Sequence, residues 1–548
     1  MPRPLSAAIA VCLAASVVPA TVLAQGESAE PLRPHAVRLT VGADWSHWTE
    51  RFAAPSPFDP ALLDGTRQPI GAYFGAESLG TRQLGFLAPT ESQLRALSHL
   101  NGWALNVGRA KLTMDASWRS TPIKLEYAIS SRLGFSASVP IVRARMSVFL
   151  TGPDSANAAT RGNVGFNKAW LTAGALDGFR SQADTALRAL RAQATGGPLA
   201  LRPQAQNEYN TLQPLVCGLY SLGAGSATDP TSPCYSASPV SQSVLLPLAT
   251  SDAGDSLTVR LASDQNGYAA LRAQYAGLGI TLPAFTQGYS LPDSALDSLG
   301  IRRLFYDRGS PLASDSLNEV VRTGIGDIEL GGWYQLTNRP HWRSQLALMV
   351  RLPTGTMDSP DNFVDLPTGD HQTDVEVALR NDVVASPNLW FHVGARYGVQ
   401  MADQLTRRVS PWYLPFAPIS STAEVKRHLG AYWALDIVPN WQLDDAFGVG
   451  VGWHYYHQAQ ATFSYVDPAD EARIGLPADV LGEATATSRM RVGAGVTFST
   501  VERFARGRAR LPYRVTWSYN TTFYGRGGQV PKAGVMQVMI QAFIGGRR

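Results

Sequence analysis

Charged side chains recur at every second position in several parts of the chain, which is the spacing that places them on one face of an extended strand. Asp327 and Glu329 follow this pattern, and Arg489 and Arg491 repeat it with the opposite charge. Because both signs are present, we expect a ladder of ion pairs along a polar surface rather than a strongly anion-selective one. The apolar residues of these stretches occupy the other set of alternate positions, so the charged residues and one histidine are assigned to the polar face. They are Arg143, Arg145, Asp327, Glu329, Arg351, Asp374, Glu376, Arg380, Arg396, His454, Arg489, Arg491 and Arg514.

Nucleophilic catalysis would need a serine beside a histidine that an acidic or amide side chain orients. His454 and His457 are three residues apart, so an extended strand places them on opposite faces. His371 neighbours Asp370 and Asp374 in a loop, but no serine forms a recognisable motif with them. The sequence therefore predicts that the protein is not an enzyme.

Metal and cofactor sites have characteristic spacings that differ from those in this chain. The loop carboxylates between Asp358 and Asp370 could bind Ca²⁺, but their spacing matches no calcium motif, so a solvated loop is favoured. The alternating glycines from Gly448 to Gly452 lie within a strand and make no phosphate-binding loop. We expect no metal and no cofactor. A formal charge of +4 without a basic run also argues against nucleic acid as a partner.

The element that would present such polar faces is clearest between Phe447 and Tyr465, where apolar and polar residues alternate with a period of two. This stretch reads as one extended strand, far longer than the five or six residues common in soluble proteins. Similar alternation recurs along the chain, and we count twelve strands. Charged residues make up only 16% of the chain against roughly 25% in a typical globular protein, which favours aromatic- and glycine-rich β-structure.

Short and long connections alternate between these strands, as they do in a membrane barrel with periplasmic turns and extracellular loops. Trp342, Trp390 and Trp441 lie beside short connections, where an interfacial aromatic girdle is expected. A soluble β-sandwich would have shorter strands and no such asymmetry of loops. The predicted fold is an all-β antiparallel transmembrane barrel of about twelve strands, with a partly helical inserted cap or plug.

Four segments follow from this interpretation. Residues 1–24 are typical of a cleavable secretory signal. Residues 25–150 hold the first barrel strands and a long loop, 151–323 the inserted cap or plug, and 324–548 the remaining strands and loops. The apolar parity changes after Pro122 and again at Pro140, which predicts a bulge in each of two strands.

The inserted segment contains Cys217 and Cys234 in a region rich in glycine, serine and proline. An exported protein meets an oxidising compartment, which favours a disulfide between them over two free thiols. Zinc would need more ligands than these two residues and their neighbours offer.

Two stretches resemble a known family. Gly324–Ile328 at the start of a strand and Arg351–Gly355 at the end of its hairpin are similar to outer-membrane proteins of the phenol-degradation meta-pathway type, which are related to the long-chain fatty-acid transporter channels. Leu125–Ala128 through Ser138–Pro140 is also similar to that group. The resemblance implies an outer-membrane channel for hydrophobic or aromatic compounds. The chain departs from the family in its large insertion and in ending on Gly-Gly-Arg-Arg.

The favoured function is therefore passive uptake of small hydrophobic or aromatic compounds across the outer membrane. The polar face would contact solute, or its charges would pair off inside a narrow or plugged barrel. The alternative is a structural or adhesive surface protein with a sealed barrel. The expected partners are outer-membrane lipids, small hydrophobic or aromatic solutes and the barrel-assembly machinery; the oligomeric state is left open.

Overall fold

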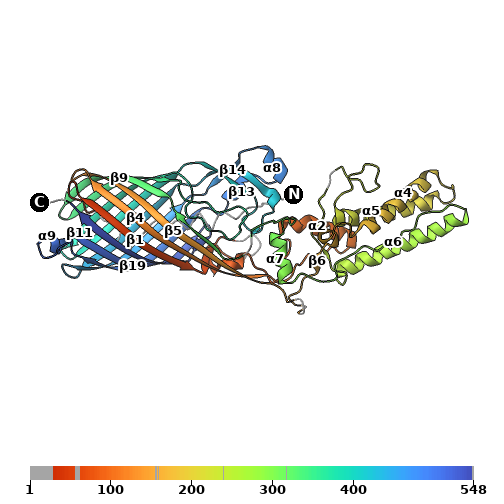
Figure 1. The fold of residues 1–548 in the computed structure, drawn as a ribbon, viewed down its shortest axis with the longest axis horizontal. Coiled ribbons are helices and arrows are strands. Elements are labelled where there is room, and N and C mark those ends of the chain that lie inside the picture. The colour runs from red at the N-terminus through yellow and green to blue at the C-terminus, as the bar shows by residue number, and fades with distance from the viewer. Residues whose placement is uncertain are drawn as a thin grey trace. The chain divides into compact units, whose positions relative to one another are not determined.

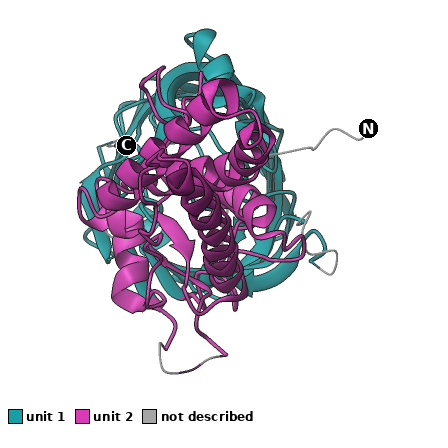
Figure 2. Cartoon of the chain, turned by 90° about the vertical axis from the view of Figure 1, so that its right-hand side faces the viewer, with its two compact units in different colours: residues 1–74, 112–149, 314–548 teal, residues 75–111, 150–313 magenta. Residues whose placement is uncertain are grey.

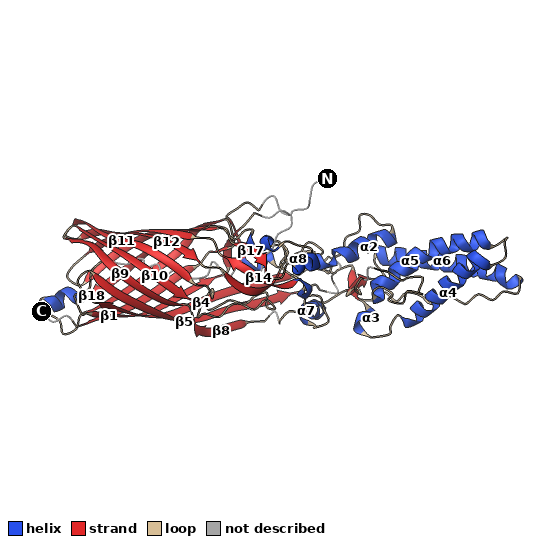
Figure 3. Ribbon diagram, turned by 90° about the horizontal axis from the view of Figure 1, so that it is seen from above, coloured by secondary structure: helices blue, strands red, loops and turns tan. Residues whose placement is uncertain are grey.

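The chain folds into two compact units in the computed structural model, which describes residues 29–55, 62–154, 157, 159–237, 240–315 and 318–545. Unit 1 comprises the chain up to Phe74, residues 112–149 and residues from 314 onward, and unit 2 comprises residues 75–111 and 150–313 (Figure 2). Unit 1 consists mainly of strands and unit 2 mainly of helices (Figure 3). The predicted signal, residues 1–24, lies outside the described residues.

Twelve strands of unit 1 close into an antiparallel barrel (Figure 1). Their order is β4-β1-β21-β19-β18-β16-β15-β12-β11-β10-β9-β5, and β5 pairs back with β4. The strands are β1 (Val37–Trp48), β4 (Lys111–Ala128), β5 (Leu133–Thr151), β9 (Ile328–Arg339), β10 (Trp342–Leu352), β11 (Asp374–Ser386), β12 (Leu389–Gln400), β15 (Tyr432–Gln442), β16 (Phe447–Gln458), β18 (Thr487–Ser499), β19 (Tyr513–Arg526) and β21 (Gly534–Ile544).

Apolar side chains cover the outside of this barrel. Within the outer band, exposed large apolar residues alternate along the strands with buried polar or small ones, and Phe135, Leu348 and Ile540 are among the most exposed. A band of this kind is what a barrel presents to lipid. The predicted fold, a transmembrane barrel of about twelve strands with a partly helical insertion, is confirmed.

The bulge predicted after Pro122 in β4 is wrong. The pairing of β4 with β1 keeps one register from Val37–Tyr127 to Trp48–Ala116. The apolar residues change side instead: near the short turn they face outward, and from Trp118 back to Leu112 they are buried inside. Gly71 of the 3-10 helix η1 (Ile70–Tyr73) lies against this inner face, where an added Cβ would come within 1.9 Å of the Leu112 carbonyl oxygen.

The same error affects β5, whose side chains alternate between the two faces without interruption through Pro140. The pairing shifts there by one residue, but the extra residue lies in the partner, between β8 and β9. Val142 and Met146 are buried, whereas Arg143 is exposed on the outer face together with Ile141. Arg145 shares that outer face and pairs with Glu319 at 2.8 Å. The prediction that Arg143 and Arg145 line the lumen is therefore wrong. Beyond the apolar band the inside of the wall packs as a core. The apolar residues therefore move to the inner face although the alternation along β4 and β5 continues unbroken.

A small lid sheet in unit 1 explains a further difference from the sequence prediction. The stretch from Phe447 to Tyr465 is not one strand: β16 ends at Gln458, and β17 (Thr462–Tyr465) joins β14 (Thr422–His428) and β13 (Asp403–Arg408) in a separate sheet. Apolar residues of this sheet pack against η4 (Ala478–Gly482) in a core of their own. The remaining elements of unit 1 are β2 (Glu50–Ala53), β3 (Thr66–Pro69), β8 (Val320–Ile325), η3 (Ile419–Ser421), α8 (Ala469–Ile474), α9 (Val501–Ala505) and β20 (Val530–Pro531).

Unit 2 is built around packed helices (Figure 2). They are α2 (Ala88–Ser98), α3 (Lys168–Leu171), α4 (Asp177–Gly196), α5 (Arg202–Ala224), α6 (Asp252–Gly277) and α7 (Ser298–Tyr306), accompanied by η2 (Gly85–Leu87), β6 (Val164–Phe166) and β7 (Leu245–Pro247). In α4, buried Phe179, Ala183, Leu187 and Leu190 recur at helical spacing, which gives the helix one apolar face. Residues 75–111 belong to this unit together with the large insertion.

No helix among the described residues is long and apolar enough to cross a membrane.

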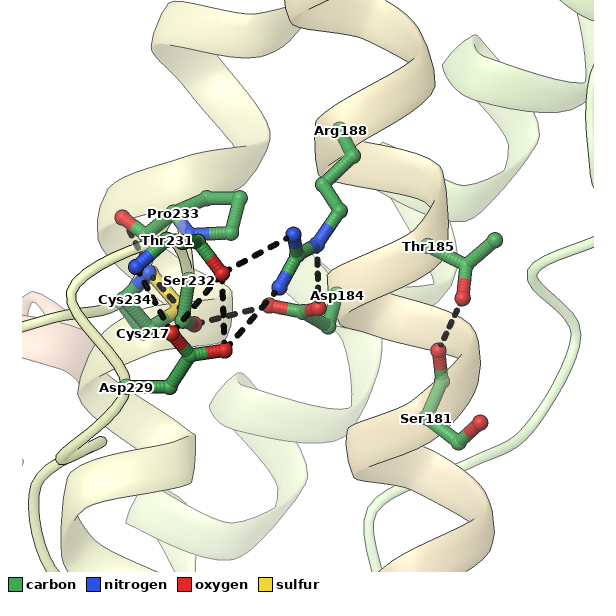
Figure 4. Close-up of polar contacts among 10 residues, drawn as sticks. All are labelled: Ser181, Asp184, Thr185, Arg188, Cys217, Asp229, Thr231, Ser232, Pro233 and Cys234. Atoms are coloured by element: carbon green, nitrogen blue, oxygen red, sulfur yellow. Dashed lines mark hydrogen bonds and ion pairs between the residues drawn. A yellow bond between two sulfur atoms is a disulfide. The ribbon is translucent and has the colours of Figure 1, made fainter.

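A disulfide joins Cys217 on α5 to Cys234 in the loop that follows it (Figure 4). The same loop is also held to α4, because Ser232 donates a hydrogen bond to Asp184 at 2.8 Å. Arg188 of α4 donates to Asp184 at 2.7 Å and reaches Thr231 of the loop at 3.3 Å. The disulfide and these polar contacts fix the loop against the α4–α5 pair.

Replacing both cysteines, Cys217→Ser with Cys234→Ser, should weaken unit 2. The bridge spans a sequence separation of 17, and closing a loop of that size stabilises by about 3 kcal/mol in the chain-entropy model. Urea unfolding followed by the far-ultraviolet helix signal should show a lower midpoint for unit 2. Reductant should lower the wild-type midpoint to the same value, and an unchanged midpoint in both would contradict the prediction.

Candidate functional site in the barrel lumen

A cavity of about 820 Å³ lies within unit 1 and is lined by inward-facing residues of the barrel. Its walls carry both charges in similar number. The charged and histidine residues that line it include Glu30, Arg38, Lys124, Glu126, Asp327, Glu329, Arg343, Arg351, Arg380, Asp382, His392 and Arg514. The lumen is therefore polar, as a barrel with an apolar outside requires.

Arg351 organises the acidic side chains of one part of the lumen. Its guanidinium contacts Asp374 at 2.6 Å and Glu329 at 3.1 Å. The Asp374 side chain is only 2% exposed, so this carboxylate depends on its partner to offset the cost of leaving water. Across the cavity, buried Glu126 pairs with Arg38 and lies 3.6 Å from Lys124.

A second group of polar side chains links β12, β15 and β16. Asp436 accepts from His454 at 2.8 Å and lies 3.4 Å from Arg396. Glu376 accepts the hydroxyl hydrogen bond of Tyr432 at 2.8 Å.

Two arginines of β18 continue this group. The Arg489 guanidinium lies over the Tyr456 ring, 4.4 Å from its centroid. Arg491 donates through Nε to the Thr522 hydroxyl at 3.3 Å. Together with the ion pairs, these contacts engage most lumen charges with protein groups.

The structure brings most of the sequence-predicted lumen residues to the inner side of unit 1. Those that it places there are Asp327, Glu329, Arg351, Asp374, Glu376, Arg380, Arg396, His454, Arg489, Arg491 and Arg514. Arg380 donates to Gln345 at 3.0 Å, and Arg514 pairs with Glu30 at 3.0 Å.

Sequence reasoning left two neighbours of these residues, Asp382 and His392, out of the predicted set; in the lumen, Nδ1 of His392 is hydrogen-bonded to the Asp382 carboxylate. Both residues occupy the same set of alternate positions as Arg380 and Arg396 on the same strands, so the sequence pattern could have identified them. Trp390 was expected on the outer girdle, but it lines the cavity and donates to His392 at 3.1 Å. Trp342 and Trp441, by contrast, are exposed beside short turns.

The segment before β1 also enters the lumen. Leu32 is buried in an apolar cluster with Trp333, Ala347 and Ala378, all from inward positions of barrel strands. Burial alone would raise the pKa of Glu30, but the nearby guanidinium of Arg514 lowers it below its ordinary value. The lead-in segment therefore binds the inside of the barrel through both apolar and ionic contacts.

The wall of the barrel is incomplete at one place. β8 pairs with the upper part of β5 but ends the strand order, so its second edge pairs with no described strand. The loop of residues 353–373, between β10 and β11, lies along this edge instead. Thr354 donates to the Gly326 carbonyl at 2.8 Å, and Thr368 donates to the Ile325 carbonyl at 3.2 Å.

Asp327, between β8 and β9, fixes loop 353–373 in this position. One of its carboxylate oxygens accepts from the Gly355 backbone N–H and the other from the Asp370 backbone N–H, both at 2.8 Å. A Cβ at Gly369 would lie 2.3 Å from this carboxylate, so the close approach requires glycine. A carboxylate that accepts two backbone N–H groups makes strong, charge-assisted contacts.

Three arginines tie the rest of this loop to the lid and to β8. Arg407 of β13 binds Asp358 through two hydrogen bonds of 2.8 Å. Arg408 binds Asp361 at 2.6 Å, and Arg322 of β8 pairs with buried Asp365.

Asp370 makes the seating of loop 353–373 sensitive to pH. Burial is the main cause, and Asp374 and Asp327 add repulsion; together they raise the pKa of Asp370 from 3.8 to about 7.

Among the described residues, no group of histidine, cysteine and acidic side chains could hold a metal ion.

No protein-family model and no curated protein matches the chain. Among solved structures, the chain is similar to an outer membrane channel from Pseudomonas putida F1, at 8% identity and a TM-score of 0.40, covering 94% of this chain and 97% of that one. It is also similar to a Pseudomonas aeruginosa FadL homologue and to the Ralstonia pickettii toluene transporter TbuX, each at 8% identity and a TM-score of 0.27, covering 93% of this chain and 90% of theirs. At such identities and TM-scores these neighbours do not establish what the chain does.

Asp327→Asn should loosen loop 353–373, because an amide has one acceptor oxygen where the carboxylate has two. The backbone N–H of Gly355 or Asp370 then loses its partner, at a cost of about 1–3 kcal/mol. Hydrogen exchange of the loop amides, followed by mass spectrometry, should accelerate about five-fold or more. Asp382→Asn removes a lumen carboxylate outside the loop and should leave that exchange unchanged; equal effects of both variants would contradict the prediction.

The same loop should close more tightly as pH falls from 8 to 6. Opening returns Asp370 to its ordinary pKa of 3.8, so the closed loop binds the proton more tightly than the open one. With the pKa raised to about 7, opening should become about ten-fold rarer over this range. Hydrogen exchange corrected for its intrinsic pH dependence measures this, and Asp370→Asn should abolish the change. An opposite trend would refute the assignment.

Proposed function

We propose that this chain is an outer-membrane channel for the passive uptake of small hydrophobic or aromatic compounds. The observation that carries the proposal is the incomplete wall at β8. Asp327, beside the β8 edge, and Thr368 and Gly369, in the loop that covers this edge, also line the lumen cavity. A solute in the cavity is thus separated from the outside of the barrel by loop 353–373 rather than by a paired strand.

A sideways route suits an apolar solute. The lumen charges are mostly engaged with one another, so an apolar molecule gains little by travelling the length of the barrel. The outer surface beside the break is apolar at Ile325, an exposed residue of β8 whose register partner on β5 is Ile141. Transfer from the cavity to lipid there is favoured by roughly 25 cal/mol for each Å² of apolar surface removed from water.

Loop 353–373 would act as the removable part of the wall in this function. A cysteine pair can test that directly, because a Cβ added at Gly324 would lie 3.7 Å from Cγ2 of Thr368. Gly324→Cys with Thr368→Cys should therefore tie the loop to β8 under oxidising conditions and release it under reducing ones.

The test is the rate at which an apolar aromatic probe, N-phenylnaphthylamine, reaches the envelope lipid of intact Gram-negative cells that express the protein. We expect wild type to accelerate uptake, the oxidised cysteine pair to slow it to the rate of cells without the protein, and reductant to restore it. Wild type treated with the same oxidant and reductant is the control for Cys217 and Cys234.

Each failure has its own meaning. If folded wild type never accelerates uptake, the transport proposal is wrong, and a structural or adhesive protein with a sealed barrel becomes the better interpretation. If wild type accelerates uptake and the oxidised pair does so equally, the solute does not pass the β8 edge.

A further inference from the structure

Two exposed arginines lie side by side on the outer surface of the barrel. Arg119 of β4 and Arg143 of β5 both point outward and are exposed. These strands pair, and in their hairpin the Ile129 N–H donates to the Leu133 carbonyl at 2.9 Å. Each arginine is ten residues from that hydrogen-bonded pair, so the two lie at the same height on adjacent strands.

The arginine pair, Arg119 and Arg143, lies where the apolar band gives way to polar surface. On the outer face, exposed Ile123 and Ile141 lie between the two arginines and the short turn. Trp45 of β1 is the register partner of Arg119, and tryptophan is enriched at the level of lipid headgroups. The long connections lie at the arginine end of these strands, which is the extracellular end of a membrane barrel.

The nearest acidic side chains on this face are already paired. Asp115 contacts His47, and Glu319 binds Arg145 at 2.8 Å. The hydrogen bond from Arg145 is the main cause of the lowered pKa of the Glu319 carboxyl, and the charge of Arg143 adds to it. Two like charges opposite one another on adjacent strands destabilise the sheet unless an anion lies between them.

We propose that the arginine pair binds the phosphate groups of a phosphorylated glycolipid in the outer leaflet of the membrane. Guanidinium groups match phosphate geometry with paired hydrogen bonds. The apolar band below would contact the acyl chains of the same lipid, so headgroup and chains bind one continuous surface. This site lies outside the lumen and does not depend on the proposed transport.

The test uses the full-length protein, refolded in neutral detergent and titrated with lipid A in mixed micelles. Native mass spectrometry measures the fraction of protein that carries the lipid. We expect Arg119→Gln with Arg143→Gln to weaken binding roughly ten- to thirty-fold, since each arginine near an anionic surface contributes about a five-fold factor. Arg119→Lys with Arg143→Lys should keep part of the affinity, because the charge remains.

Arg132→Gln with Arg510→Gln is the matched control, because it removes two exposed arginines in turns at the other end of the barrel. It should bind lipid A as wild type does. Dephosphorylated lipid A should bind weakly and equally to all variants. Unchanged binding of lipid A by the glutamine pair, or equal binding of the two lipids by wild type, would overturn the proposal.

Discussion

The whole of unit 1 depends on one constraint: in a bilayer every backbone N–H and C=O must find a partner within the protein. Twelve strands satisfy it by closing, with β4 paired to both β1 and β5 and with β21 joining β1 to β19. β8 is the exception, and at the end of its second edge the carbonyls of Ile325 and Gly326 accept hydrogen bonds from side chains of loop 353–373. The carboxylate of Asp327 is central to that solution, since it binds the backbone of this loop at two points. A wall element held by a few polar contacts opens more readily than a strand held along its length.

The alternation of side chains shows which face of a strand meets an apolar environment. It identifies the inward face only where that apolar environment is known to be lipid or to be a protein core. Along β18 or β11 the apolar residues face lipid, so parity alone identifies Arg489, Arg491 and Glu376 as inward-facing. Along the upper parts of β4 and β5 the apolar residues face a packed interior. The same rule then assigns Arg143 and Arg145 to the wrong face, although the side chains of both strands alternate without interruption.

Long-range contacts set the other limits of sequence interpretation. The strand count and the inserted helical segment follow from periodicity, which is local. That residues 75–111 fold with the insertion does not follow, because it depends on packing between segments distant in the chain. Likewise, Asp327 was assigned to the polar face, but its bonds to Gly355 and Asp370 come from a loop that has no periodicity. β17 does not continue the pairing of β16, because it pairs with β14 instead. The alternation of residue types does not show which strand is the partner.

A solute meets different free-energy costs in the lumen and at the wall of the barrel. Arg351, Asp374 and their neighbours are buried and paired, and separating such a pair costs several kcal/mol, about 3–5 when one partner is lost. In the proposed route, a polar solute that competes for these charges must offset that cost, whereas an apolar solute leaves the pairs intact and has to displace loop 353–373. Displacing this loop also has a cost, because three arginines form ion pairs with it and the Asp327 carboxylate accepts two of its backbone N–H groups. In the function proposed above, the paired lumen charges therefore favour apolar solutes over charged ones, and the contacts of loop 353–373 set the cost of opening the β8 edge.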